Sequence, residues 1–163
     1  MNAPLFGDFR FDIQGLAQAI AHCHASDALS CKFSMADWEI LAAYMQPFAL
    51  QSGQVLIEQG THDRTLYFIE SGTLSVHFED DKSRIHMALV CSGSVVGEGA
   101  FFSHRPRTAT VQASGPCKLW CLSPVRFLEL TNRHCAIALE LTLALGSVIA
   151  KRLNLRPKRV AVT

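Results

Sequence analysis

One acidic and one basic side chain, nine residues apart, are the clearest candidates for binding chemistry in this sequence. Glu98 follows Gly97, and Arg107 stands immediately before Thr108. Apolar residues precede Gly97, so a short turn or helix is expected to begin there, and its first backbone amides have no intrahelical partner and suit an anion. Arg107 can bring a forked, permanently charged guanidinium to the same anion, and Thr108 adds a hydroxyl donor.

A carboxylate in a site that also holds an anion needs a partner of its own. Ionised Glu98 can only accept hydrogen bonds, so a sugar hydroxyl is its natural partner. An anion together with a sugar hydroxyl indicates a nucleotide. Neither half of the pattern is sufficient, because a Gly-Glu pair is common and residues 106–108 alone form a turn before a strand.

The stretch of residues 97–111 resembles the phosphate-binding cassette of cyclic-nucleotide-binding domains. Two further stretches match this family in the same order. Residues 53–60 resemble its first hairpin, and residues 66–76 resemble its central strands around the turn at Gly72. The resemblance spans about residues 48–132, and three separately spaced motifs support it.

The resemblance implies a role for each residue of the cassette. Glu98 would accept a hydrogen bond from the ribose 2′-hydroxyl, while Arg107 and Thr108 would hold the cyclic phosphate. Backbone groups would come from Gly97, Gly99 and Ala100. Gly99 departs from the family pattern, since many members carry a bulkier apolar residue there, and this departure bears on affinity. The implied ligand is cAMP or cGMP. Thr108 suits either, and the bacterial character of the match favours cAMP.

The region between residues 48 and 122 consists of short apolar or alternating runs separated by glycines. This pattern is typical of a β-roll or jelly-roll barrel. Strands are expected at residues 55–58, 66–70, 74–78, 84–90, 109–113 and 118–122, and residues 94–96 are strand-like. The family resemblance implies eight strands, flanked by N-terminal helices and a long C-terminal helix. The expected organisation of this mainly β fold is a helical extension (1–47), the barrel (48–122) and C-terminal helices with a basic tail (123–163).

Helices are expected on both sides of the barrel. Apolar residues recur every three or four positions in residues 12–25, which predicts an amphipathic helix. Ser34 can cap the next helix, and the residue before Pro47 is expected to end it. Ser123, followed by a proline, is a good helix start. A long final helix is expected over residues 135–155.

The final helix carries two apolar stripes. One stripe can cover the mouth of the barrel and contains Ile137, Leu141, Leu145 and Val148. The other contains Leu139, Leu143, Ile149 and Leu153. A helix that is apolar on more than one face needs a second partner, and in related bacterial regulators the equivalent helix pairs with its copy. We therefore expect a homodimer through this helix. The basic residues at its end, Arg152 among them, suit the helix dipole, and the alternative is a tail that binds anionic lipid or nucleic acid.

Composition narrows the function classes. The chain has 163 residues, a net charge of +1 and 18% charged residues, so its overall charge does not indicate binding to nucleic acid. Its hydrophobic content of 49% argues against disorder. Six cysteines without a repeated spacing suggest free thiols in a reducing cytoplasm. The N-terminus lacks the pattern of a signal peptide. The longest apolar run, residues 135–150, is too short for a membrane span.

The sequence contains no pattern typical of a catalytic or metal site. Residues 22–24 read His-Cys-His, with Cys31 following, but a structural zinc site requires four ligands in a paired pattern. A jelly-roll metal enzyme would require two histidines spaced two apart on a strand. The four histidines of the predicted barrel, His62, His77, His86 and His104, form no such pair. No nucleophile motif is present, so we expect neither an enzyme nor a bound cofactor.

The predicted function is a stand-alone sensor that binds a cyclic nucleotide and signals through helix movement to a protein the sequence does not identify. Arg156 lies near the place where family members cap the base. In the resembling bacterial transcription factors a winged helix follows the final helix, whereas here the chain ends soon after Pro157, so no DNA-binding domain is expected. The alternatives are a ligand-free scaffold that only dimerises or docks, and a piece of a larger receptor or channel regulator.

Overall fold

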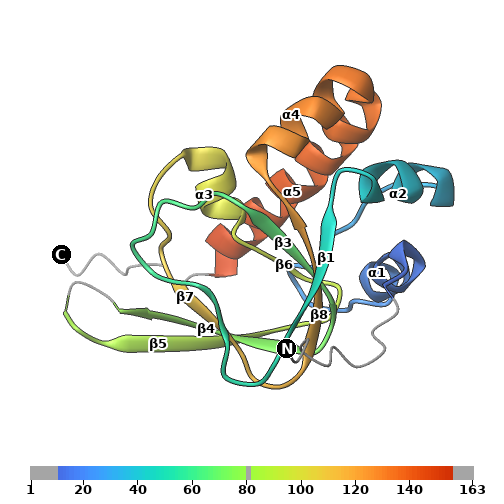
Figure 1. Ribbon diagram of the computed structural model, residues 1–163. Helices are drawn as coiled ribbons and strands as arrows, with labels where there is room; N and C mark the ends of the chain where they lie inside the picture. Colours follow the sequence, from blue (N-terminus) through green and yellow to red (C-terminus); the bar gives the residue numbers. More distant parts are fainter. Residues whose placement is uncertain (1–10, 80–81, 156–163) are drawn as a thin grey trace, which may run out of the picture.

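Two antiparallel sheets of four strands each form the centre of the molecule (Figure 1). The structure is a computed structural model that describes residues 11–79 and 82–155. The strand order is β1-β8-β3-β6 in one sheet and β2-β7-β4-β5 in the other. The strands are β1 (Gln46–Leu50), β2 (Val55–Ile57), β3 (Leu66–Ser71), β4 (Thr73–Glu79), β5 (Ile85–Cys91), β6 (Val95–Val96), β7 (Thr110–Ala113) and β8 (Cys117–Leu122).

The two sheets enclose a small apolar core. Its members alternate along their strands and come from both sheets, for example Leu74 on β4 and Leu119 on β8, each with no exposed surface. The described residues contain the eight strands that the family resemblance implies. The predicted barrel is not closed, because the described residues form two separate hydrogen-bonded sheets.

The six strands expected from the sequence are present to within one residue at each end, but β1 was not predicted. Pro47 was interpreted as the residue that stops the preceding helix, whereas it lies inside β1, opposite Trp120. The helix ends earlier, at Ala42. Proline has no N–H to donate, and β1 tolerates it because this strand lies at the edge of its sheet.

Five helices complete the described part of the chain: α1 (Ile13–Ala21), α2 (Met35–Ala42), α3 (Glu98–Ser103), α4 (Pro124–Arg133) and α5 (Cys135–Leu155). The predicted caps are confirmed for α2 and α4. Ser34 and Asp37 form a capping box at α2, and Ser123 accepts a hydrogen bond from the amide of Arg126 at α4. Within the described residues, none of the helices has both the length and the hydropathy that a membrane crossing requires.

Helix α1 is shorter than the predicted stretch of residues 12–25. Gly93, in the turn between β5 and β6, approaches its end so closely that a Cβ there would lie 2.3 Å from the carbonyl oxygen of Ala19 and 2.6 Å from Cβ of Cys23. Beyond α1 the chain turns toward the main core and buries Leu29. Tertiary packing, rather than local pattern, therefore sets the end of α1.

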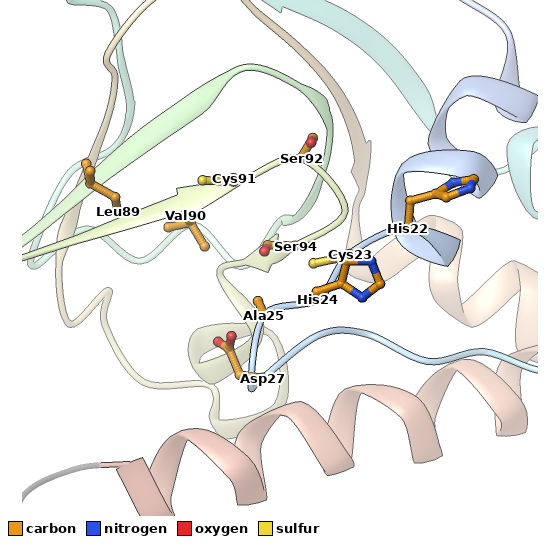
Figure 2. A pocket seen from close by; sticks show the side chains of 10 residues that line it. All are labelled: His22, Cys23, His24, Ala25, Asp27, Leu89, Val90, Cys91, Ser92 and Ser94. Carbon is orange, nitrogen blue, oxygen red and sulfur yellow. The ribbon is translucent and has the colours of Figure 1, made fainter.

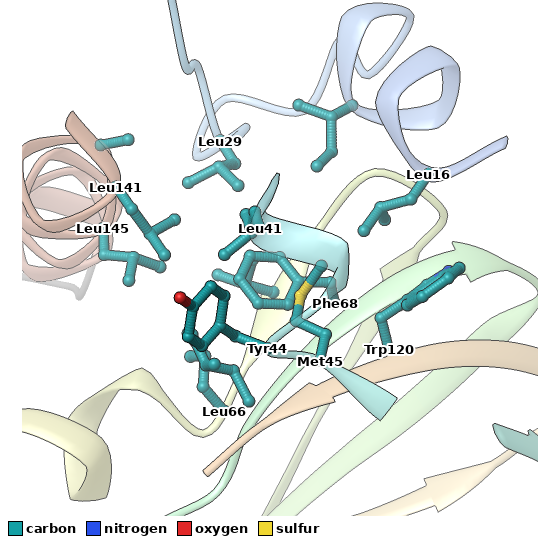
Figure 3. Packing of buried hydrophobic residues seen from close by; sticks show 14 of the residues in the cluster. Leu16, Leu29, Leu41, Tyr44, Met45, Leu66, Phe68, Trp120, Leu141 and Leu145 are labelled. Atoms are coloured by element: carbon teal, nitrogen blue, oxygen red, sulfur yellow. The ribbon is translucent and has the colours of Figure 1, made fainter. Parts of the chain in front are cut away.

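The larger core joins the helices to one sheet (Figure 3). Leu16 of α1, Phe68 of β3 and Leu141 of α5 have no exposed surface and belong to the same cluster. The apolar stripe predicted to cover the barrel is buried along its whole length, from Ile137 to Val148. The same core thus supports α5 and the sheet that leads into the cassette.

Candidate functional site

The cassette begins where β6 passes into α3. Gly97 caps α3 with a positive φ of 89°, which favours glycine. A Cβ at this position would lie 2.6 Å from Nη1 of Arg107 and 2.8 Å from the carbonyl oxygen of Thr65. Glycine is therefore required at residue 97, both for its backbone conformation and for the close approach of the arginine.

Arg107 is buried, with 3% of its surface exposed. Its Nη1 donates to the carbonyl oxygen of Gly97 at 3.1 Å, and its Nη2 donates to that of Thr65 at 2.7 Å. Nη2 also forms an ion pair with Asp63. The buried Nε–H has no hydrogen-bond partner among the described residues. A buried donor without a partner is costly, and Nε of Arg64 shares this property.

Asp63 belongs to the site, although the sequence analysis did not single it out. Its carboxylate accepts hydrogen bonds from the amide and the hydroxyl of Thr65 at 3.1 and 2.8 Å, besides its pair with Arg107. Burial alone would raise the pKa of Asp63, but the hydrogen bonds from Arg107 and Thr65 outweigh burial and lower that pKa. Asp63 therefore stays ionised and orients Arg107. No local pattern links it to a residue 44 positions away.

Arg64, which follows Asp63, contacts the C-terminal end of α3. Nη2 of Arg64 donates to the carbonyl oxygen of Phe101 at 3.0 Å and lies 3.0 Å from Nε2 of His104. His104 follows α3 with a positive φ of 58°. The segment before β3 therefore contacts both ends of α3. Arg64 binds its C-terminal end directly, and Asp63 binds Arg107, which contacts Gly97 at its start.

Glu98 is the first residue of α3, and its partner comes from the last turns of α5. Its Oε1 lies 2.6 Å from Nη1 of Arg152. Arg152 also contacts Asp27, in the connection between α1 and α2, and the backbone of Val95. Arg152 lies in the last turn of α5, as expected for a residue that suits the helix dipole, but its ion pair with the cassette was not predicted. Nothing in the spacing of Glu98 and Arg152 indicates that contact.

The remaining predicted residues are placed as follows. Ala100 is buried in α3, and Thr108 is exposed after the cassette arginine. A Cβ added to Gly99 would meet no atom within 4 Å, so a larger residue would fit there. Arg156, the predicted base cap, lies outside the described residues. The structure brings Gly97 and Arg107 into direct contact, whereas Glu98 and Arg107 hold different partners.

A hollow lies beside the end of α1 (Figure 2). It has a volume of about 350 Å³, and its lining includes His22, Cys23 and His24 as well as Cys91 of β5. Among residues 11–79 and 82–155, no three side chains of histidine, cysteine, aspartate or glutamate gather as metal ligands. All six cysteines of the chain are free thiols.

Comparison with known proteins assigns the chain to a family. The sequence pattern described as "Cyclic nucleotide-binding domain" matches residues 47–134, more than half of the chain. The chain belongs to this family. The match includes both ends of the cassette, Gly97 and Arg107, as well as Asp63.

Two relatives illustrate the similarity in sequence. The cAMP-dependent protein kinase type II regulatory subunit of Drosophila melanogaster is 39% identical over 64 residues, which cover 39% of this chain and 17% of that protein. The cGMP-dependent protein kinase of Plasmodium berghei is 33% identical over 102 residues, 59% of this chain and 11% of that protein. The aligned part is thus less than a fifth of either relative.

A solved cyclic nucleotide-binding domain from Methylobacillus flagellatus KT has the same fold. It superposes with a TM-score of 0.77 at 22% identity, covering 87% of this chain and 78% of that chain. At this identity the likeness supports the fold alone. The family neighbours are regulatory binding domains rather than catalytic ones.

Proposed function

We propose that this chain is a regulatory sensor module that binds a cyclic mononucleotide at the cassette and signals to a partner protein by rearrangement of its helices. The observation that carries the proposal is Arg107: a buried guanidinium, oriented by Asp63, with its Nε–H left for an anion. Burial of a charged side chain costs free energy unless the charge is paired and hydrogen-bonded. Membership of the cyclic nucleotide-binding domain family supplies the class of ligand.

The proposed roles follow the geometry of the cassette. The cyclic phosphate would meet Nε of Arg107 and the first amides of α3, at Glu98, Gly99 and Ala100. Glu98 would accept from the ribose 2′-hydroxyl through Oε2, because Arg152 already holds Oε1. Thr108 and Arg156 remain proposals for contacts to phosphate or base. No step of turnover is proposed, since the site offers binding groups only.

The choice between cAMP and cGMP is left to experiment. The two aligned kinase relatives are a cAMP-dependent and a cGMP-dependent protein, so they do not distinguish the two ligands. We propose the cytoplasm as its location, because six cysteines without a repeated spacing suit a reducing compartment. A ligand-free scaffold of the same fold is the competing function.

The test is isothermal titration calorimetry of the protein with cAMP and with cGMP. Two arginines of the same loop provide matched variants. Arg107→Lys keeps the charge but loses the forked donors, and it is expected to weaken binding at least about tenfold, or about 1.4 kcal/mol. Arg105→Lys, at an exposed position, is expected to leave affinity unchanged. No heat of binding with either nucleotide at millimolar concentration would favour the scaffold.

We also propose that α5 pairs with α5 of a second copy. The residues exposed along one side of α5 are all apolar or small and follow one another at alternating steps of three and four: Ala136, Leu139, Leu143, Gly146, Ala150 and Leu153. This is the spacing of a helix that packs along its length against another helix.

Gly146 strengthens the proposal of a helix pair. A Cβ there would meet no atom within 4 Å, so nothing in the described part of the chain requires glycine, although glycine costs a helix about 1 kcal/mol relative to alanine. Close approach of a second helix would explain it. Analytical ultracentrifugation should show a dimer that Leu143→Glu dissociates. Leu128→Glu is a matched control on α4, since Leu128 and Leu143 are 60% and 62% exposed.

A further inference from the structure

Arg152 connects three distant parts of the chain at the cassette. Its Nε donates to Oδ2 of Asp27 at 2.6 Å, and its Nη1 lies 2.6 Å from Oε1 of Glu98. Its Nη2 donates to the carbonyl oxygen of Val95 at 2.9 Å. Every nitrogen of the guanidinium therefore has a partner, and the plane of the fork is set by contacts on both of its edges.

The ion pairs of Arg152 are shielded from solvent. The side chains of Arg152, Asp27 and Glu98 are 24%, 21% and 15% exposed, respectively. Burial alone would lower the pKa of Arg152, but the charges of Glu98 and Asp27 outweigh it and raise that pKa. One positive charge is thus shared by two carboxylates in a region where salt screens interactions less than at the open surface.

We propose that Asp27 is a positioning residue for the nucleotide site, acting through Arg152 on Glu98. The inference rests on the proposed function. Asp27 and the Val95 carbonyl hold the guanidinium from two sides, so its third nitrogen holds Oε1 of Glu98 at a set position. The carboxylate then presents Oε2 in one orientation to the ribose hydroxyl, instead of sampling several rotamers before binding.

The segment that carries Asp27 is itself anchored to α5. Nζ of Lys151 donates to the carbonyl oxygen of Ala28 at 3.2 Å, and the amide of Lys32 donates to Oε1 of Glu140 at 2.7 Å. Both contacts lie just after Asp27 along the chain and keep its segment on α5 at two further points. A change at Glu98 on nucleotide binding would therefore reach the connection between α1 and α2 through Arg152.

Competition between Asp27 and Glu98 for Arg152 would have a different effect on nucleotide affinity. If Asp27 competed with Glu98 for Arg152, its removal would tighten the pair between Arg152 and Glu98 and would leave nucleotide affinity unchanged or increased. Positioning predicts a weaker site. The two readings therefore differ in the sign of one binding measurement.

The experiment is calorimetric titration of the full chain with the cyclic nucleotide that the wild-type protein binds. Asp27→Asn keeps the shape of the side chain and removes its charge. We expect about fivefold weaker binding, which corresponds to about 1 kcal/mol and is the upper range for a partly exposed ion pair. Asp37→Asn is the matched control, because Asp37 also belongs to the N-terminal segment but, among the described residues, bonds to Ser34 in the capping box of α2 and not to Arg152.

A double-mutant cycle separates positioning from a general loss of structure. In an Arg152→Gln background, Asp27→Asn should cause no further loss of affinity, because its route to Glu98 is already broken. Asp27→Glu should restore part of the affinity. An equal loss in both backgrounds would overturn the inference, as would wild-type affinity in Asp27→Asn. Absence of binding by the wild-type protein would instead refute the proposed function itself.

Discussion

Two glycines of the cassette, two positions apart, should respond to alanine in opposite ways. At Gly97 the backbone has a φ of 89°, which is unfavourable for any residue with a Cβ and costs about 1–3 kcal/mol. The added methyl would also lie 2.6 Å from Nη1 of Arg107 and 2.8 Å from the carbonyl oxygen of Thr65. Both distances are shorter than a van der Waals contact.

Arg107 cannot move away from the added methyl group without losing hydrogen bonds. Its guanidinium is buried and bonded to Asp63, Thr65 and Gly97, and hydrogen bonds to charged groups contribute about 1.5–3 kcal/mol each. We therefore expect Gly97→Ala to lower the free energy of unfolding by at least about 2 kcal/mol, or very roughly 4–8 °C in Tm for a chain of this size. Because Arg107 is displaced, nucleotide affinity should fall at least about tenfold.

Gly99→Ala is the matched control. Gly99 lies in α3, its φ is not positive, and a Cβ there would meet nothing within 4 Å. Alanine is better than glycine in a helix by about 0.5–1 kcal/mol. The free energy of unfolding should therefore rise slightly, and nucleotide affinity should stay within about threefold of wild type. The sequence analysis associated Gly99 with altered affinity, and this variant tests that association directly.

Urea unfolding followed by tryptophan fluorescence is a suitable assay, because Trp38 and Trp120 are each only 5% exposed. Calorimetry with cAMP and cGMP gives the affinities of the same samples. If Gly97→Ala unfolded at the same urea concentration as Gly99→Ala, the close approach of Arg107 to Gly97 would be refuted. If only its stability fell while its affinity persisted, the assignment of Arg107 to the phosphate would be refuted instead.

Three further predictions concern other parts of the molecule. Burial and the charge of Glu140 raise the pKa of Cys31 to about 12, so iodoacetamide at pH 8 should modify exposed Cys135 in the native protein and Cys31 only after unfolding, as mass spectrometry of digests would show. The lowered pKa of Asp63 contributes stability that is present above its unfolded pKa of about 3.9 and is lost as the pH falls through its folded pKa. Acid titration should accordingly show a shallower stability loss for Asp63→Asn. Gly15→Ala should destabilise α1 against β3, since its Cβ would lie 2.6 Å from Oε1 of buried Glu70, and a thermal melt no lower than wild type would contradict that packing.

Local features of this fold could be read directly from the sequence. The capping box joins Ser34 and Asp37, three positions apart, and the start of α4 needs only Ser123 and the proline after it. One contact of the cassette is also local: Nη1 of Arg107 donates to the carbonyl oxygen of Gly97, ten positions away. Where all partners lie within about ten residues, residue type and spacing determine the contact.

Contacts between distant segments depended on tertiary structure. Asp63 reaches Arg107 across 44 positions, and Arg152 reaches Asp27 across 125. Each of these side chains alone resembles a solvated charge in a turn or at a helix end. Their roles arise because the core places β3, α3 and α5 against one another, and no short-range pattern records that placement.

Helix α5 shows both kinds of determination in one element. Its bounds and its two apolar stripes were predicted from the sequence, and both are confirmed. Periodicity treats the two stripes alike, because each is apolar at helical spacing. Only packing against the sheet decided that Leu141 and Leu145 are buried while Leu139 and Leu143 remain exposed. In this chain the sequence determined most of the segments that become helix or strand, with β1 as the exception, whereas the shared core decided which of their faces stay exposed.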